Sequence, residues 1–167
     1  TTRNTKLMIY SSPCNPTGTV YTKNELRGIA NYFAENKGVN VIADEIYEHI
    51  TFEGKHESLA QFEDIYDQVI TINGVSKAFA MTGWRVGYMG APLWIAKACS
   101  KMQGQFTSGT CSISQRAAKA AVEAHPKETR YMTEAFDRRR KLAHGLLSEI
   151  PGLKINMPQG AFYFFQI

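Results

Sequence analysis

Short runs of strand-forming residues alternate with segments of helical periodicity along most of this chain. The runs lie at 6–10, 39–43, 69–72 and 85–90. Strands that are apolar almost without interruption are buried on both faces, as in parallel sheets that helices cover on either side. The sequence therefore predicts an α/β fold, with a mostly parallel sheet flanked by helices.

Capping residues and apolar spacing mark the helices between these runs. Thr22 and Glu25 have the spacing of a capping box, and apolar residues recur on one helical face after them. The remaining predicted elements are helices that start at Pro92 and span 114–124 and 126–150, and short strands at 153–157 and 161–166.

Charge and hydropathy argue against several classes of partner. The net charge is +4, from 19 Lys and Arg against 15 Asp and Glu, and the basic residues are not interleaved with aromatic ones. No nucleic-acid partner is therefore expected. The one dense basic run, 138–141, falls in a helical pattern and is interpreted as a solvated helix face. No apolar run approaches the ~18 residues of a transmembrane helix, so no membrane partner is expected either.

The three cysteines are Cys14, Cys99 and Cys111, an odd number without the spacing of metal ligands. This pattern predicts free thiols in a reducing compartment, here the cytoplasm, and no metal site.

The fourteen residues 74–87 carry the strongest chemical signal. Lys77 stands in a loop of small residues that follows a predicted strand, with Ser76 directly before it and Arg85 eight positions after it. A lysine at the end of a buried strand can lose its proton and attack a carbonyl carbon. A serine and an arginine nearby can hold a phosphate. A lysine for an aldehyde, with a serine and an arginine for its phosphate, describes a site for pyridoxal 5′-phosphate (PLP), which is the cofactor that this stretch predicts.

Two further polar blocks follow predicted strands. Ser11-Ser12-Pro13-Cys14-Asn15-Pro16-Thr17-Gly18 follows the first strand, and Asp44-Glu45-Ile46-Tyr47 follows the second. Open α/β sheets bind ligands at the carboxyl ends of their strands. The three blocks are therefore expected to converge on one site.

These blocks, taken together and in this order, resemble the fold-type I PLP-dependent aminotransferases of classes I and II. In detail they are most similar to the aspartate aminotransferase group. The resemblance runs along the whole chain and implies an internal piece of a longer protein. It assigns 1–125 to part of the PLP-binding large domain, 126–150 to a long interdomain helix, and 151–167 to the beginning of a small domain.

The resemblance implies a catalytic set of Lys77, Asp44 and Tyr47. Lys77 would form the Schiff base with PLP and then shuttle the proton. Asp44 would keep the pyridine nitrogen protonated, as an electron sink requires. Tyr47 would donate to the phenolic oxygen of the ring. Glu45, the neighbour of Asp44, is interpreted as structural.

The resemblance also implies further binding residues. Asn15 would donate to the same phenolic oxygen and reach the substrate carboxylate, so it is both cofactor-binding and substrate-binding. Ser76 and Arg85 would hold the phosphate. Phe162 and Tyr163, near the end of the chain, are interpreted as packing residues.

The function that the resemblance implies is transamination between an amino acid, with aspartate as the expected one, and a 2-oxo acid such as 2-oxoglutarate. The enzyme would be a homodimer that acts in amino-acid metabolism and biosynthesis. Residues 1–167 alone would be inactive, because further site residues lie outside them. Polar loop 105–112 is either a plain connection or part of the subunit interface.

Two alternatives of other classes remain. One is a PLP enzyme of the same fold but another reaction, such as an aminocyclopropane-carboxylate synthase. Those usually have Leu-Pro-Gly-Phe-Arg where this chain has Met81-Thr82-Gly83-Trp84-Arg85. The other is a non-catalytic aminotransferase-like sensor domain of a transcription regulator, a class that tends to lose the Asn-Pro-Thr-Gly block that is intact here.

Overall fold

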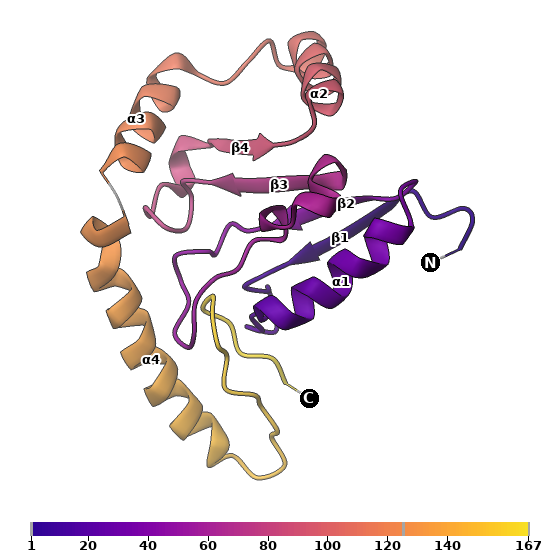
Figure 1. Cartoon of the computed structure of the whole chain (residues 1–167). Coiled ribbons are helices and arrows are strands. Elements are labelled where there is room, and N and C mark those ends of the chain that lie inside the picture. Colours follow the sequence, from indigo (N-terminus) through magenta and orange to yellow (C-terminus); the bar gives the residue numbers. More distant parts are fainter. Residues whose placement is uncertain (1, 125, 167) are drawn as a thin grey trace.

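The computed structural model describes residues 2–124 and 126–166 and contains a four-stranded sheet in the order β1-β2-β3-β4 (Figure 1). The strands are β1 (Leu7–Ser11), β2 (Asn40–Asp44), β3 (Val69–Gly74) and β4 (Gly87–Gly90). The first three run parallel, and β4 pairs antiparallel with β3. The predicted α/β fold with a mostly parallel sheet is confirmed.

The register of the strands brings their carboxyl ends together. Asp44, the last residue of β2, lies opposite Ser11 of β1 and Ile72 of β3. Gly74 at the end of β3 lies opposite Gly87 at the start of β4, so the connection 75–86 leaves and re-enters the sheet at the same edge. The residues that follow the parallel strands are therefore neighbours, as the sequence predicts.

Helix α1 (Lys23–Glu35) begins where its capping box predicts. Thr22 Oγ1 accepts a hydrogen bond from Glu25 N at 3.3 Å, and Glu25 Oε2 accepts one from Thr22 N at 2.7 Å. Leu26, Ala30 and Phe33 form its buried face. The other helices are α2 (Leu93–Phe106), α3 (Ser112–Glu123) and α4 (Arg130–Ser148), with short 3-10 helices at Leu59–Gln61, Glu63–Gln68, Thr82–Trp84 and Pro126–Thr129.

The main core lies between α1, the two short helices at 59–68 and one face of the sheet. Its members include Leu26, Phe33, Val41, Leu59 and Ile65. The opposite face of the sheet is only partly covered in the described part of the chain. Leu7, Ile9 and Ile72 are 45%, 67% and 37% exposed. The prediction of strands buried on both faces therefore holds fully for one face only, since on the other face Ile70 is buried but Leu7 and Ile9 of β1 are exposed.

The segment after α4 does not form the strands predicted at 153–157 and 161–166. It contains single antiparallel bridges, Ile155 with Gln166 and Gly160 with Thr51. A strand needs a continuous neighbour to pair with, and the described residues supply none here. The segment instead returns from the end of α4 toward the loops of the sheet, where Figure 1 draws it in yellow.

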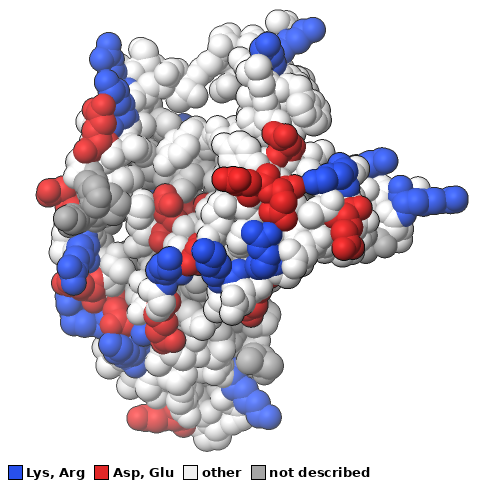
Figure 2. Space-filling model, in the orientation of Figure 1, with Lys and Arg blue, Asp and Glu red and all other residues white. Residues whose placement is uncertain are grey.

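The basic run 138–141 was predicted to be a solvated helix face, and this is wrong for Arg140, which is 7% exposed. The Arg140 guanidinium forms ion pairs with Glu53 and Asp137 at 2.9 and 2.8 Å, and donates to the carbonyl oxygen of Pro158 at 2.6 Å. The Arg140 side chain therefore connects α4 to the returning segment, residues 149–166. The rest of the run is exposed, and Figure 2 shows basic and acidic side chains intermixed along this side of the molecule.

The expected domain boundary at residue 125 lies outside the described residues. Among the helices at 2–124 and 126–166, none combines the length and the apolar character that crossing a membrane requires.

Candidate active site

Lys77 lies in the turn that follows β3, at the carboxyl edge of the parallel strands. Its Nζ is 5.7 Å from the centroid of the Tyr47 ring and 5.6 Å from that of Phe162. The side chain is half-buried, and its amine has no hydrogen bond or ion pair within the described residues. The structure thus holds the amine beside two aromatic rings that contact each other, and no carboxylate among the described residues is bound to it.

Tyr47 is 3% exposed, and its hydroxyl lies 2.6 Å from that of Tyr163. Burial raises the pKa of Tyr47 well above its ordinary value, and the nearby Asp44 carboxylate raises it further. Tyr47 is therefore a neutral phenol at physiological pH and keeps a proton to donate.

Asp44 ends β2 and is half-buried, although its three apolar predecessors predict a buried position. Its Oδ1 accepts a hydrogen bond from Ile46 N at 3.2 Å. That bond closes a short turn in which the side chain of Asp44 caps its own backbone. The turn places Asp44 and Tyr47 on the same side of the sheet edge, close enough for the carboxylate to affect the phenol.

Ser76 and Lys77 line one cavity of about 210 Å³. The other residues of its wall come from the 80–82 connection, from α4 and from the returning segment: Ala80, Thr82, Met132, Phe136 and Phe162. Cavities for small ligands span about 300–1,000 Å³. The cavity that the described residues form is therefore smaller than a typical ligand cavity.

Asn15 and Arg85 are at the same edge but outside this cluster. Asn15 is exposed, in a turn whose Asn15–Pro16 peptide bond is cis. The Arg85 guanidinium is exposed and donates to the carbonyl oxygen of Thr82 at 2.8 Å. Within the described residues neither side chain forms a hydrogen bond with Lys77. The structure thus brings Lys77, Tyr47 and Ser76 together and leaves Asn15 and Arg85 apart from them.

The loop between β3 and β4 adopts an unusual backbone conformation. Ala80 and Arg85 have φ angles of 52° and 54°. Residues other than glycine occupy this region at a cost, and such positions cluster at functional sites. The strain lies in the same connection as Ser76 and Lys77, which supports a functional role for this loop.

Sequence reasoning treated Phe162 and Tyr163 as packing residues and so missed their place in the site. Phe162 faces the Lys77 amine, and the Tyr163 hydroxyl is hydrogen-bonded to that of Tyr47, 116 residues away in the sequence. No local pattern reveals contacts of that range. The only available signal is a pair of aromatic residues after the small residues at 160–161.

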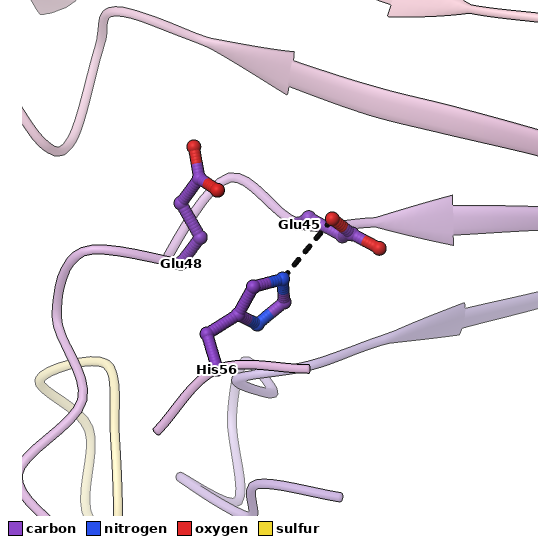
Figure 3. A group of neighbouring side chains, drawn as sticks. All are labelled: Glu45, Glu48 and His56. Atoms are coloured by element: carbon purple, nitrogen blue, oxygen red, sulfur yellow. Dashed lines mark hydrogen bonds and ion pairs between the residues drawn. The ribbon is translucent and has the colours of Figure 1, made fainter. Parts of the chain in front are cut away.

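Glu45, next to Asp44, is 3% exposed. Its carboxylate lies 3.0 Å from His56 Nε2 and accepts a hydrogen bond from Ser58 Oγ at 2.7 Å. Figure 3 shows the imidazole directed at Glu45, with Glu48 beside the pair. Glu48 Oε1 accepts a hydrogen bond from Asn73 Nδ2 at 2.7 Å. These contacts satisfy the carboxylates, so the cluster fixes the turn after β2, in agreement with the structural interpretation of Glu45.

The fold and the groups at its carboxyl edge define a class: an α/β protein with an amine at the centre of its candidate ligand site. The family model described as "Aminotransferase class I and II" matches residues 1–167. The chain belongs to this family.

The names of similar proteins agree with this family. The chain is 46% identical to a bifunctional aspartate aminotransferase and glutamate/aspartate-prephenate aminotransferase from Petunia hybrida, over 98% of the chain and 35% of that protein. It is 43% identical to an aspartate aminotransferase from Pinus pinaster, over 97% of the chain and 34% of that protein.

Solved structures give the same fold. An aspartate aminotransferase from Rhizobium meliloti superimposes with a TM-score of 0.95 at 38% identity, over 99% of this chain and 42% of that one. An aromatic aminotransferase from Pyrococcus horikoshii gives 0.92 at 41% identity, over 99% of this chain and 45% of that one. The chain thus spans less than half the length of the relatives that it matches.

Proposed function

We propose that the protein of which this chain forms a part is a PLP-dependent aminotransferase, which transfers the amino group between aspartate and a 2-oxo acid such as 2-oxoglutarate. The observation that carries the proposal is the Lys77 amine, which has no hydrogen bond or ion pair within the described residues and lies beside the rings of Tyr47 and Phe162 in the cavity that Ser76 also lines. Family membership and the names of the relatives support the reaction and the choice of aspartate.

The donor set fits PLP chemically. An aldehyde needs an amine, which Lys77 offers without an ion pair to displace within the described residues. A pyridine nitrogen needs a carboxylate, and Asp44 is half-buried at the same edge. A phenolic ring oxygen needs a donor, and burial keeps Tyr47 protonated. PLP, when bound, supplies an electron sink that stabilises negative charge at the Cα of the amino acid.

In this proposal Lys77 has two roles. Its Nζ would hold the cofactor covalently and, once released by a substrate amine, would take the proton from the substrate Cα and return it. The rings of Tyr47 and Phe162 lie beside Nζ and exclude water from part of its surroundings. Asp44 and Tyr47 would hold the ring of the cofactor at its nitrogen and at its phenolic oxygen.

The remaining assignments concern binding. Ser76 and Arg85 are proposed to hold the phosphate, since a guanidinium presents a fork of donors that matches phosphate oxygens. Asn15 is proposed to donate to the phenolic oxygen and to the substrate carboxylate. Both Asn15 and Arg85 are exposed at the sheet edge, so their side chains are accessible to a ligand.

The extent of the protein is also part of the proposal. Residues 1–125 would belong to a large domain, 126–150 to an interdomain helix and 151–167 to the start of a small domain. Apolar side chains of the sheet and of α2 are exposed, among them Ile9, Trp94 and Phe106. Exposed apolar surface of this kind supports the proposal that other parts of the protein and a second subunit cover it, as in a homodimer. The free cysteines suit the reducing cytoplasm.

The test is covalent labelling of the complete protein. Loaded with PLP, it should absorb visible light, and borohydride should fix the cofactor on the peptide that contains Lys77. Lys77→Ala should abolish the label, whereas Lys97→Ala, which changes an exposed lysine of α2, should leave it intact. Label on another lysine would refute the assignment. A screen of amino acids against 2-oxoglutarate then tests aspartate as substrate.

A further inference from the structure

The contact between Tyr47 and Tyr163 joins the candidate site to the segment that follows α4. Their hydroxyl oxygens are 2.6 Å apart, and their rings meet edge to face with centroids 5.8 Å apart. A distance of 2.6 Å is short for a hydrogen bond between two hydroxyl groups. The two phenols therefore share one hydrogen bond, and either oxygen can be the donor.

The backbone around Tyr163 is anchored independently of this bond. Ala161 is fully buried, and its N–H donates to the carbonyl oxygen of Ile50 at 2.8 Å. The Phe162 ring packs against Tyr47 at 5.3 Å and stacks on Phe136 of α4 at 5.2 Å. These contacts fix the residues before Tyr163, so its hydroxyl is delivered to Tyr47 by a held backbone rather than by a free loop.

The direction of the hydrogen bond between Tyr47 and Tyr163 determines whether Tyr47 can donate its own proton to a third group. Each neutral phenol carries one proton. If Tyr47 donated to Tyr163, its own proton would be used inside the pair. If Tyr163 donates instead, the Tyr47 proton is free for another acceptor, and accepting a bond makes Tyr47 a stronger donor.

We propose that Tyr163 is a positioning residue of the candidate site: it donates to the Tyr47 oxygen and so directs the Tyr47 proton to an acceptor beside Lys77. The inference rests on the proposed function, in which that acceptor is the phenolic oxygen of the cofactor. Tyr163 itself touches neither cofactor nor substrate in this role. It acts through Tyr47 alone.

Because Tyr163 acts through Tyr47 alone, the proposal can be tested by a double-mutant cycle in the complete, PLP-loaded protein. The visible absorption of the bound cofactor is followed as a function of pH in the wild type, Tyr47→Phe, Tyr163→Phe and the double variant. A donor to the ring oxygen stabilises its ionised form. Loss of the donor therefore leaves the lysine–cofactor linkage protonated to higher pH, and the midpoint rises.

Tyr163→Phe should raise the midpoint by less than Tyr47→Phe does. A bond to a charged group that is strengthened by 10–30% corresponds to a rise of roughly 0.1–0.7 pH unit. In the Tyr47→Phe background, Tyr163→Phe should change nothing further. Tyr66→Phe removes a hydroxyl from an exposed tyrosine and should leave the midpoint unchanged. The other titratable groups near Tyr47, Asp44 and Lys77, are the same in all four proteins.

An unchanged midpoint in Tyr163→Phe, or an equal shift in both backgrounds, would overturn the proposal. Failure of Tyr163→Phe to fold, seen by circular dichroism, would also overturn it, because the residue would then be structural. The proposed function is judged separately by the borohydride label on Lys77 in the wild type. If that label is absent, the proposed function fails and this inference fails with it.

Discussion

Gly18 connects the turn that carries Asn15 to the segment after α4, and we expect Gly18→Ala to destabilise the protein strongly. The φ angle of Gly18 is +69°, a region that side chains rarely adopt. A Cβ built there would overlap the Cβ of Pro158 and lie 2.9 Å from its Cα. The carbonyl oxygen of Gly18 also accepts hydrogen bonds from Gln159 N and Gly160 N, at 2.8 and 2.9 Å.

The magnitude follows from two contributions. A left-handed backbone costs about 1–2 kcal/mol for a residue with a Cβ. Forcing an added methyl group into a packed contact costs about 1–3 kcal/mol. The free energy of unfolding should therefore fall by about 2–5 kcal/mol. Gly54 provides the matched control, because its φ is +70° and nothing lies within 4 Å of its added Cβ. Gly54→Ala should cost only the backbone contribution, about 1–2 kcal/mol.

The assay is equilibrium unfolding in urea of the complete protein and its two variants, followed by circular dichroism. The difference between the variants isolates the contact of Gly18 with Pro158, since both carry the same backbone strain. If Gly18→Ala is no less stable than Gly54→Ala, the close packing of the returning segment on the Asn15 turn is wrong.

Two further predictions concern single carboxylates. Asp44→Ala should still bind PLP but lose roughly 10³-fold in turnover, at ~1.4 kcal/mol per decade, because an unprotonated pyridine is a poor electron sink; near-normal turnover measured by steady-state kinetics would refute its role. Partial burial acts to raise the pKa of Glu48, but hydrogen bonds from His49 and Asn73 outweigh it and hold this pKa below its ordinary value of 4.5. The stability that Glu48 contributes is therefore present above the ordinary value and lost as pH falls through the lowered one. Glu48→Gln should lose less stability than the wild type between about pH 6 and pH 3 in urea titrations, and an unchanged pH profile would contradict the shift.

Much of the fold and part of the site follow from the sequence because their determinants are local. The capping box at Thr22 fixes the start of α1 with contacts between residues three positions apart. The apolar runs specify three strands, and parallel pairing places whatever follows them at one edge. Lys77 and Asp44 therefore belong to the same edge on sequence grounds alone.

Only the tertiary structure decided how segments far apart in the chain meet. Residues 161–166 have strand-like composition, but no strand lies beside them in the described chain, so the segment packs its aromatic rings against Tyr47 and α4 instead. Arg140 has the sequence context of a solvated side chain and is buried because Glu53 and Pro158 come to it from elsewhere. The sequence by itself determined which residues could do chemistry. Packing over long separations determined which of them touch, because those contacts depend on the whole arrangement of the core and not on neighbours in the chain.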